Sequence, residues 1–156
     1  MKSRIIAFGE RTPAWADTAV REYLQRLPRQ FAVELRVLPL SRRSDVHALE
    51  RQRMQEDSKM RAEIRAEEFV IALDEHGKQW TTAEFAKQIA QWQSDARQCC
   101  ILIGGPEGLG PQSRQRANVH LALSSMTMPH ALARVVVAEQ WYRAWSLQAG
   151  HPYHRE

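Results

Sequence analysis

The last six residues, HPYHRE at 151–156, carry side chains suited to binding a nucleic acid. Tyr153, His154 and Arg155 stand in a row, with His151 three positions before His154. An aromatic ring stacks on a base, an arginine holds a phosphate, and an imidazole exchanges a proton near neutral pH. The ordinary alternative is a chain end that packs on its own domain or frays. A His-x-x-His metal pair is a weaker alternative, because no third ligand is near it in sequence.

A second group of candidate residues lies in GGPEGLG at 104–110, directly after an apolar run. The loop is not a Walker A motif, because no Gly-Lys-Ser/Thr follows, and the glycine spacing differs from that of a dinucleotide fingerprint. A loop so poor in side chains offers bare backbone groups, which suits a flat neutral ligand such as a nucleobase. The alternative is a tight turn that needs a positive φ angle.

Two further segments have the same character. LSSMTMPH at 123–130 combines an apolar wall with backbone groups that suit an adenine ring, although a plain strand-to-helix connection capped by Thr127 is the simpler interpretation. LDEHGK at 73–78 is polar around a glycine, as turns are. A metal site there is disfavoured, because the candidate ligands are few and no second cluster matches them.

The elements that must position these segments alternate along the chain. Apolar runs and helical periodicity predict strands and helices in alternation, with Ser44 or Asp45 capping the second helix and Thr81 or Thr82 the third. The predicted strands are 4–8, 31–40, 68–74, 99–104 and 119–124. The predicted helices are 13–27, 44–64, 81–94, 111–118 and 129–149. This order predicts an α/β fold with a mostly parallel sheet and helices on both faces, in a single domain spanning 1–156.

The parallel sheet gives the three loops a common place. Ligands of open parallel sheets bind beyond the carboxyl ends of the strands, and 73–78, 104–110 and 123–130 each follow such an end. We therefore expect the three loops to form one site.

Composition favours an RNA partner and a reducing compartment. The net charge is +4, and 18 of the 22 basic residues are arginines, the side chain that best pairs with phosphate. A GC-rich genome would also give many arginines.

Cys99 and Cys100 are adjacent in a predicted strand, so they should face opposite ways and not pair. The first 15 residues are too polar for a signal peptide, and we expect a soluble, cytoplasmic protein.

The helix predicted at 129–149 is apolar on more than one side. It carries more apolar residues than one core-facing stripe needs: Leu132, Val135, Val136, Val137, Trp141, Tyr142 and Trp145. We infer that this helix serves both a core and a second copy of the chain, which predicts a homodimer. Glu139 and Arg143 are four apart on it, so a helical ion pair is the plain interpretation of these two.

Four of these segments occur together, in one order and at one spacing: LDEHGK, ILIGGPEGLG, LALSSMTMPHALARVVVAEQWYRAW and HPYHRE. In this the chain resembles the RlmH family of ribosomal large-subunit pseudouridine N3-methyltransferases, which belongs to the SPOUT class. The resemblance covers the whole chain, including YLQRLPR near its start, and is most specific in the last 55 residues.

The resemblance implies more than the residues alone do. It implies a SPOUT-type α/β knot, in which the C-terminal part forms a trefoil knot, and a homodimer that binds S-adenosyl-L-methionine and no metal. It implies methylation of N3 of a pseudouridine in 23S rRNA, in the large subunit or the assembled ribosome. The cofactor-binding residues implied are Leu73, Gly104, Leu123, Ser124, Ser125, Met126, Thr127 and Met128.

The catalytic residues are hypotheses from residue chemistry and from their place in the shared motifs. Arg155 and Arg143 would stabilise negative charge, Tyr153 would orient the base, and His154 or His130 would accept the N3 proton. Arginines between residues 21 and 65 would contact rRNA. Three other functions stay open: a SPOUT enzyme acting on another RNA base, a non-catalytic ribosome-binding protein, and a flavodoxin-like nucleotide binder.

Overall fold

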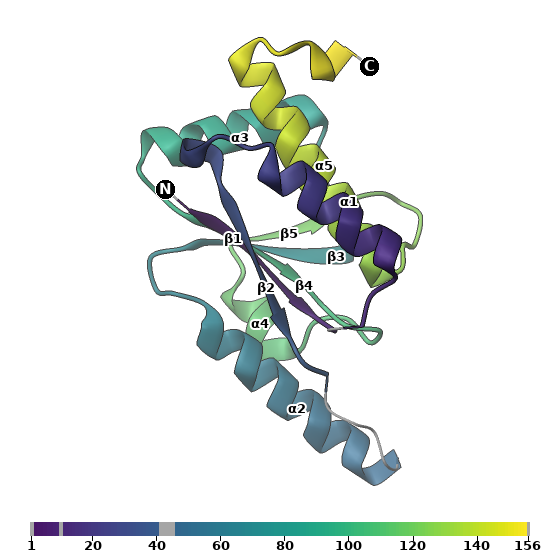
Figure 1. Ribbon diagram of the computed structural model, residues 1–156. Coiled ribbons are helices and arrows are strands. Elements are labelled where there is room, and N and C mark those ends of the chain that lie inside the picture. The colour runs from purple at the N-terminus through teal and green to yellow at the C-terminus, as the bar shows by residue number, and fades with distance from the viewer. Residues whose placement is uncertain (1, 10, 41–45, 156) are drawn as a thin grey trace.

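A computed structural model describes residues 2–9, 11–40 and 46–155 of the chain. Over these residues, strands and helices alternate as predicted (Figure 1). The strands are β1 Ser3–Phe8, β2 Val33–Leu38, β3 Phe69–Gln79, β4 Cys99–Ile103 and β5 Val119–Ala122. The α-helices are α1 Ala14–Gln25, α2 Val46–Glu63, α3 Thr82–Ser94, α4 Pro111–Arg116 and α5 His130–Ala149. Two 3₁₀ helices, η1 Arg29–Phe31 and η2 Pro152–Arg155, complete the described elements.

The five strands form one sheet in the order β2-β1-β4-β3-β5. Every neighbouring pair is parallel, which confirms the predicted α/β class. Helices α1, α3 and α5 cover one face of the sheet, and α2 and α4 cover the other (Figure 1). Parallel strands have their carboxyl ends at one edge, so this architecture gathers the loops that follow β3, β4 and β5.

Residues of one strand alternate between two apolar cores. Cys99, Ile101 and Ile103 pack with α1, α3 and α5, whereas Cys100 and Leu102 pack on the α2 side. This is the two-residue period of a strand buried on both faces. It confirms that Cys99 and Cys100 face opposite ways, and both are free thiols.

Most predicted boundaries are close to the observed ones. Thr81 caps α3 with a complete capping box, because its hydroxyl accepts from the backbone of Glu84 while the Glu84 carboxylate accepts from the backbone of Thr81. The second strand was predicted too long: the chain forms η1 through Phe31 and becomes extended only at Val33. The proposed caps Ser44 and Asp45 lie outside the described residues.

The prediction that a strand ends at Asp74 and is followed by a loop is wrong. β3 continues to Gln79, and Leu121 of β5 is the register partner of both Leu73 and Lys78. The four residues between, 74–77, have no register partner on β5 and form a bulge inside the strand. Gly77 is required there, because a Cβ would lie 2.6 Å from the His120 carbonyl group.

A buried ion pair joins the start of β1 to the start of β3. The guanidinium of Arg4 donates two hydrogen bonds of 2.7 Å to Glu68, whose side chain is fully buried. Burial alone would raise the pKa of Glu68, but the hydrogen bonds from Arg4 and from the Arg65 backbone outweigh it and leave that pKa below its ordinary value. Arg4 also donates to the carbonyl of Glu63, at the end of α2.

None of the helices in the described ranges is long and apolar enough to span a bilayer.

The Arg4–Glu68 pair generates a stability prediction. Arg4→Met should lower the free energy of unfolding by about 3–5 kcal/mol, because it leaves a buried carboxylate without its partner. Arg4→Met combined with Glu68→Leu should recover most of that loss. Because the folded pKa of Glu68 is lowered, the pair stabilises the protein at neutral pH, and its contribution should fade as the pH falls through that pKa.

Urea unfolding at pH 7 and at acidic pH measures these differences. An Arg4→Met protein as stable as the wild type at pH 7 would contradict the assignment.

Candidate active site

A cavity of about 760 Å³ lies at the carboxyl edge of the sheet. The bulge of β3, the glycine loop after β4 and the loop between β5 and α5 all line it, as the sequence predicts. Seven of the eight predicted cofactor residues belong to the lining: Leu73, Gly104, Leu123, Ser124, Met126, Thr127 and Met128. Ser125 lies in the same loop but is exposed and outside the lining.

The glycine loop is shaped first by its own backbone. A Cβ on Gly104 would lie 2.4 Å from the carbonyl carbon of Gly108, so no larger residue fits there. The N–H of Gly108 donates to the carbonyl of Gly105 at 2.9 Å, and Gly108 has a φ of +77°. The tight-turn interpretation is therefore confirmed. It is compatible with a ligand role, because the folded loop still presents its backbone to the cavity.

The bulge of β3 brings acidic groups to the cavity. Asp74 pairs with Arg114 at 2.7 Å, and its side chain is nearly buried. The backbone N–H of His76 donates to Asp74, and this bond, then the charge of Arg114, lowers the pKa of Asp74. Glu75 accepts a hydrogen bond from the hydroxyl of Thr127 at 3.3 Å, which ties the bulge to the loop after β5. Asp74 thus stays ionised at neutral pH.

His130 and Arg134, both on α5, lie beside the end of β1. Arg134 is buried, and its Nη2 donates to the carbonyls of Phe8 at 2.6 Å and of Gly9 at 2.7 Å. His130, which lines the cavity, lies beside the same corner. Burial, and secondarily the charge of Arg134, lowers the pKa of His130. The imidazole is therefore neutral at neutral pH, the form that accepts a proton.

The other predicted catalytic residues lie elsewhere in the chain. Arg143 is thirteen residues after His130 on α5, about 20 Å along the helix axis. Tyr153, His154 and Arg155 belong to η2, beyond the far end of α5 from the cavity (Figure 1). Of the five predicted catalytic residues, only His130 lines the cavity of its own chain.

Residues 151–155 are nevertheless folded rather than frayed. The ring of Tyr153 packs edge-on against Tyr142, and its hydroxyl lies 3.2 Å from that of Tyr23. The predicted ion pair of Glu139 and Arg143 is present at 2.7 Å. Nδ1 of His154 is buried and makes no hydrogen bond within the described parts of the chain.

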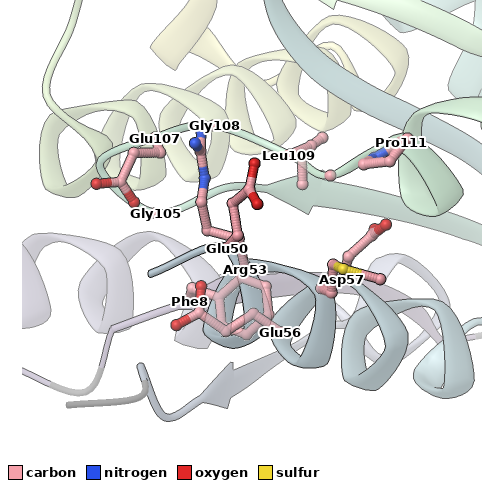
Figure 2. Close-up of a pocket in the computed structure, with 12 residues that line it drawn as sticks. Phe8, Glu50, Arg53, Glu56, Asp57, Gly105, Glu107, Gly108, Leu109 and Pro111 are labelled. Atoms are coloured by element: carbon pink, nitrogen blue, oxygen red, sulfur yellow. The ribbon is translucent and has the colours of Figure 1, made fainter. Parts of the chain in front are cut away.

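A second, smaller pocket of about 330 Å³ lies between α2 and the glycine loop (Figure 2). It shares Gly105, Glu107, Gly108 and Leu109 with the main cavity, so this loop lines both. Figure 2 shows side chains of α2 directed toward the loop. One of them, Asp57, accepts hydrogen bonds from the backbone N–H groups of Gln112 and Ser113 and from the Ser113 hydroxyl. The Asp57 carboxylate thereby caps the N-terminus of α4.

Sequence reasoning missed three of these residues. Asp57 and Arg134 form hydrogen bonds with backbone groups 55 or more positions away in the sequence, and no local pattern reveals such contacts. Arg114 partners Asp74 from the short helix after the glycine loop. The one available signal for Arg114 was its place just after a predicted ligand loop.

The chain is similar to known methyltransferases over nearly its whole length. Residues 1–154 match a family model described as "Predicted SPOUT methyltransferase". Ribosomal RNA large subunit methyltransferase H of Paraburkholderia phymatum is 42% identical over 155 residues, which cover 99% of each protein. Among solved structures, a probable methylase family protein from Haemophilus influenzae superposes with a TM-score of 0.60 at 14% identity, covering 96% of this chain and 69% of the other. That structural likeness concerns the fold alone.

The glycine loop yields a paired prediction. Gly104→Ala should lower the free energy of unfolding by about 1–3 kcal/mol, because the new methyl group overlaps the backbone at Gly108. Gly108→Asn is the matched control, since asparagine tolerates a positive φ and a Cβ at Gly108 meets nothing within 4 Å. Thermal unfolding of both variants checks the difference, and equal stability of the two would count against the close approach at Gly104.

Proposed function

This chain belongs to the SPOUT methyltransferase family, and on that premise we propose that it transfers a methyl group from S-adenosyl-L-methionine to N3 of a pseudouridine in 23S rRNA of the large ribosomal subunit. The observation that carries the proposal is the cavity at the carboxyl edge, built from the three loops on which the family resemblance rests. The near full-length identity to a ribosomal RNA large subunit methyltransferase supports the substrate class.

The cavity suits the methyl donor in size and in chemistry. Ligand pockets commonly enclose about 300–1,000 Å³, and this one lies within that range. Its apolar wall of Leu73, Leu121 and Leu123 fits an adenine ring, and the carboxylates of Glu75 and Glu107 suit a ligand with two cationic centres. We propose Leu73, Gly104 and the 123–128 loop as the cofactor-binding residues.

When bound, S-adenosyl-L-methionine supplies an activated methyl group on a sulfonium. The residues of the protein then have two tasks: to align N3 of the base with that methyl group and to manage the N3 proton. Neutral His130 at the cavity wall supports the role of proton acceptor. Arg143 and Arg155 are cations suited to stabilising charge on the base or its phosphate, and Tyr153 and His154 to holding the base.

The separation of these residues favours a homodimer. Pocket and tail lie at opposite ends of α5, so the tail of one subunit would serve the pocket of the other. Leu132, Val135 and Val136 remain partly exposed on α5, which supplies apolar surface for a partner. We propose residues 1–156 as one catalytic domain that works as such a dimer, with the trefoil knot that the family resemblance implies.

The rRNA has to be bound by the same small protein. Residues 21–65 hold 11 basic and seven acidic side chains, a net charge of +4. We propose that arginines from this region contact rRNA phosphates in the ribosome. We propose that methyl transfer takes place in the cytoplasm. Binding of the protein to the ribosome should weaken steeply as the salt concentration increases.

A calorimetric titration tests the methyl donor. Saturable binding of S-adenosyl-L-methionine to the wild type, weakened at least about tenfold by Thr127→Pro, is expected, because proline distorts the loop and removes its hydroxyl contact with Glu75. Ser94→Ala, at the end of α3, is the control and should bind as the wild type does. A wild type that binds no donor would point to the non-catalytic ribosome-binding alternative.

Subunit mixing tests the shared site. Arg155→Ala and a pocket variant such as Thr127→Pro should each be nearly inactive in methyl transfer to ribosomes. Refolding them together at equal amounts should restore about a quarter of the wild-type sites, because half of the dimers would be mixed and each would hold one intact site. Absence of any recovery, with mixed dimers shown to form, would contradict a site shared between subunits.

A further inference from the structure

Three hydrogen-bond donors converge on one carboxylate oxygen of Glu139. Arg143 donates to Oε1 through Nε at 2.8 Å and approaches it through Nη2 at 2.7 Å. The hydroxyl of Tyr153 donates to the same oxygen at 3.1 Å. The second oxygen, Oε2, accepts from the side-chain amide of Gln140 at 2.8 Å. Both oxygens of Glu139 therefore have partners, and these include two of the predicted catalytic residues.

The same contacts fix the ring of Tyr153 from several sides. The guanidinium of Arg143 lies 5.0 Å from the ring centroid, in a cation–π contact. Tyr142 packs edge-on at a centroid distance of 4.7 Å, and Tyr23 reaches the hydroxyl from α1. Burial, then the hydrogen bond with Tyr23 and the charge of Glu139, raises the pKa of Tyr153, so the phenol keeps the proton that it donates.

We propose that Glu139 is a positioning residue: its carboxylate holds Arg143 and, through Tyr153, the η2 turn with His154 and Arg155 in the geometry that the methyl-transfer site requires. This inference rests on the proposed function, since it concerns the residues that would act on the base. Glu139 itself would touch neither substrate nor cofactor.

A purely structural role for Glu139 would look different. None of the residues of η2 is fully buried, and Tyr153 is the residue of the turn that packs against the edge of the apolar core. The ion pair is partly exposed, with 17% of the Glu139 side chain and 23% of the Arg143 side chain accessible, and such pairs contribute little to stability. Loss of Glu139 should therefore loosen the tail while the domain stays folded.

The charge of the Glu139 carboxylate matters because Arg143 and Tyr153 must already be in position before the substrate binds. An arginine side chain on a helix surface samples many rotamers, and the observed contacts select one of them. Misplacement of a catalytic group by about 1 Å costs on the order of a hundredfold in rate. The effect of losing Glu139 should therefore appear in kcat for methyl transfer, while donor binding, which depends on the three loops of the cavity, should not change.

The experiment compares Glu139→Ala and Glu139→Gln with the control Glu22→Gln. Glu22 forms a similar ion pair with Arg26, four residues on, but on the exposed surface of α1, where Arg26 lies over the ring of Tyr142 rather than that of Tyr153. We expect Glu139→Ala to lower kcat about a hundredfold, and Glu139→Gln to lose less because its amide oxygen still accepts from Tyr153. The control should stay within about twofold of the wild type, and all three should bind S-adenosyl-L-methionine normally and melt near the wild-type temperature.

Two further readouts separate positioning from other roles. In a background of Arg143→Ala and Tyr153→Phe, adding Glu139→Ala should lower the rate by less than about threefold, because its partners are already gone. Release of the C-terminal residues by carboxypeptidase Y should be faster for Glu139→Ala than for the control. This second readout needs no enzymatic activity, so it tests the clamp even if the wild type transfers no methyl group.

A wild-type kcat in Glu139→Ala would overturn the proposal, as would unchanged tail protection or a full additional loss in the double-variant background. If the wild type binds no donor and methylates no ribosome, yet the tail still loosens without Glu139, the proposed function fails and the structural clamp stands.

Discussion

The constraint on which this molecule depends is that all neighbouring strands are parallel. Parallel strands place every carboxyl end at one edge, and there the bulge of β3, the glycine loop and the loop after β5 meet around one cavity. Backbone geometry then sets how closely they approach. Gly77 and Gly104 each stand where a Cβ would overlap neighbouring backbone, so the two glycines allow contacts that no other residue permits. The Asp74–Arg114 ion pair joins the bulge to α4, and the hydrogen bond from Thr127 to Glu75 joins the loop after β5 to the bulge.

The sequence predicted what depends on local periodicity. The opposite facing of Cys99 and Cys100, the capping box at Thr81 and the meeting of three loops follow from strand period, helix capping and strand direction. The prediction was wrong where the structure of one segment depends on its pairing with a segment distant in sequence. β3 continues beyond Asp74 only because β5 pairs with it again at Lys78. A polar run with a central glycine is typical of a turn, and nothing local distinguishes it from a bulge.

Other parts of the site were equally hidden, for the same reason. Arg134 holds the end of β1 from more than a hundred residues away, and Asp57 caps a helix on a different part of the chain. These contacts depend on how the elements pack, and single-sequence patterns carry no such information. The family resemblance named the chemistry and the residues of the tail, but it could not place that tail relative to the cavity within one chain. The knot likewise stays a prediction, because periodicity says nothing about the path of the chain through its own loops.

The length of α5 makes the case for a second subunit stronger than its apolar surface does. A helix of 20 residues extends about 30 Å and is too stiff to fold back. Its first residue, His130, and the η2 turn beyond its last residue therefore cannot approach each other within one chain. A two-fold axis that is perpendicular to two such helices and passes between their midpoints would set them antiparallel. In the proposed dimer, each His130 would then lie toward the η2 turn of the other subunit. On this view the clamp at Glu139 is the means by which one subunit presents fixed groups to the other, and a rigid helix with a fixed turn at its end is suited to that purpose.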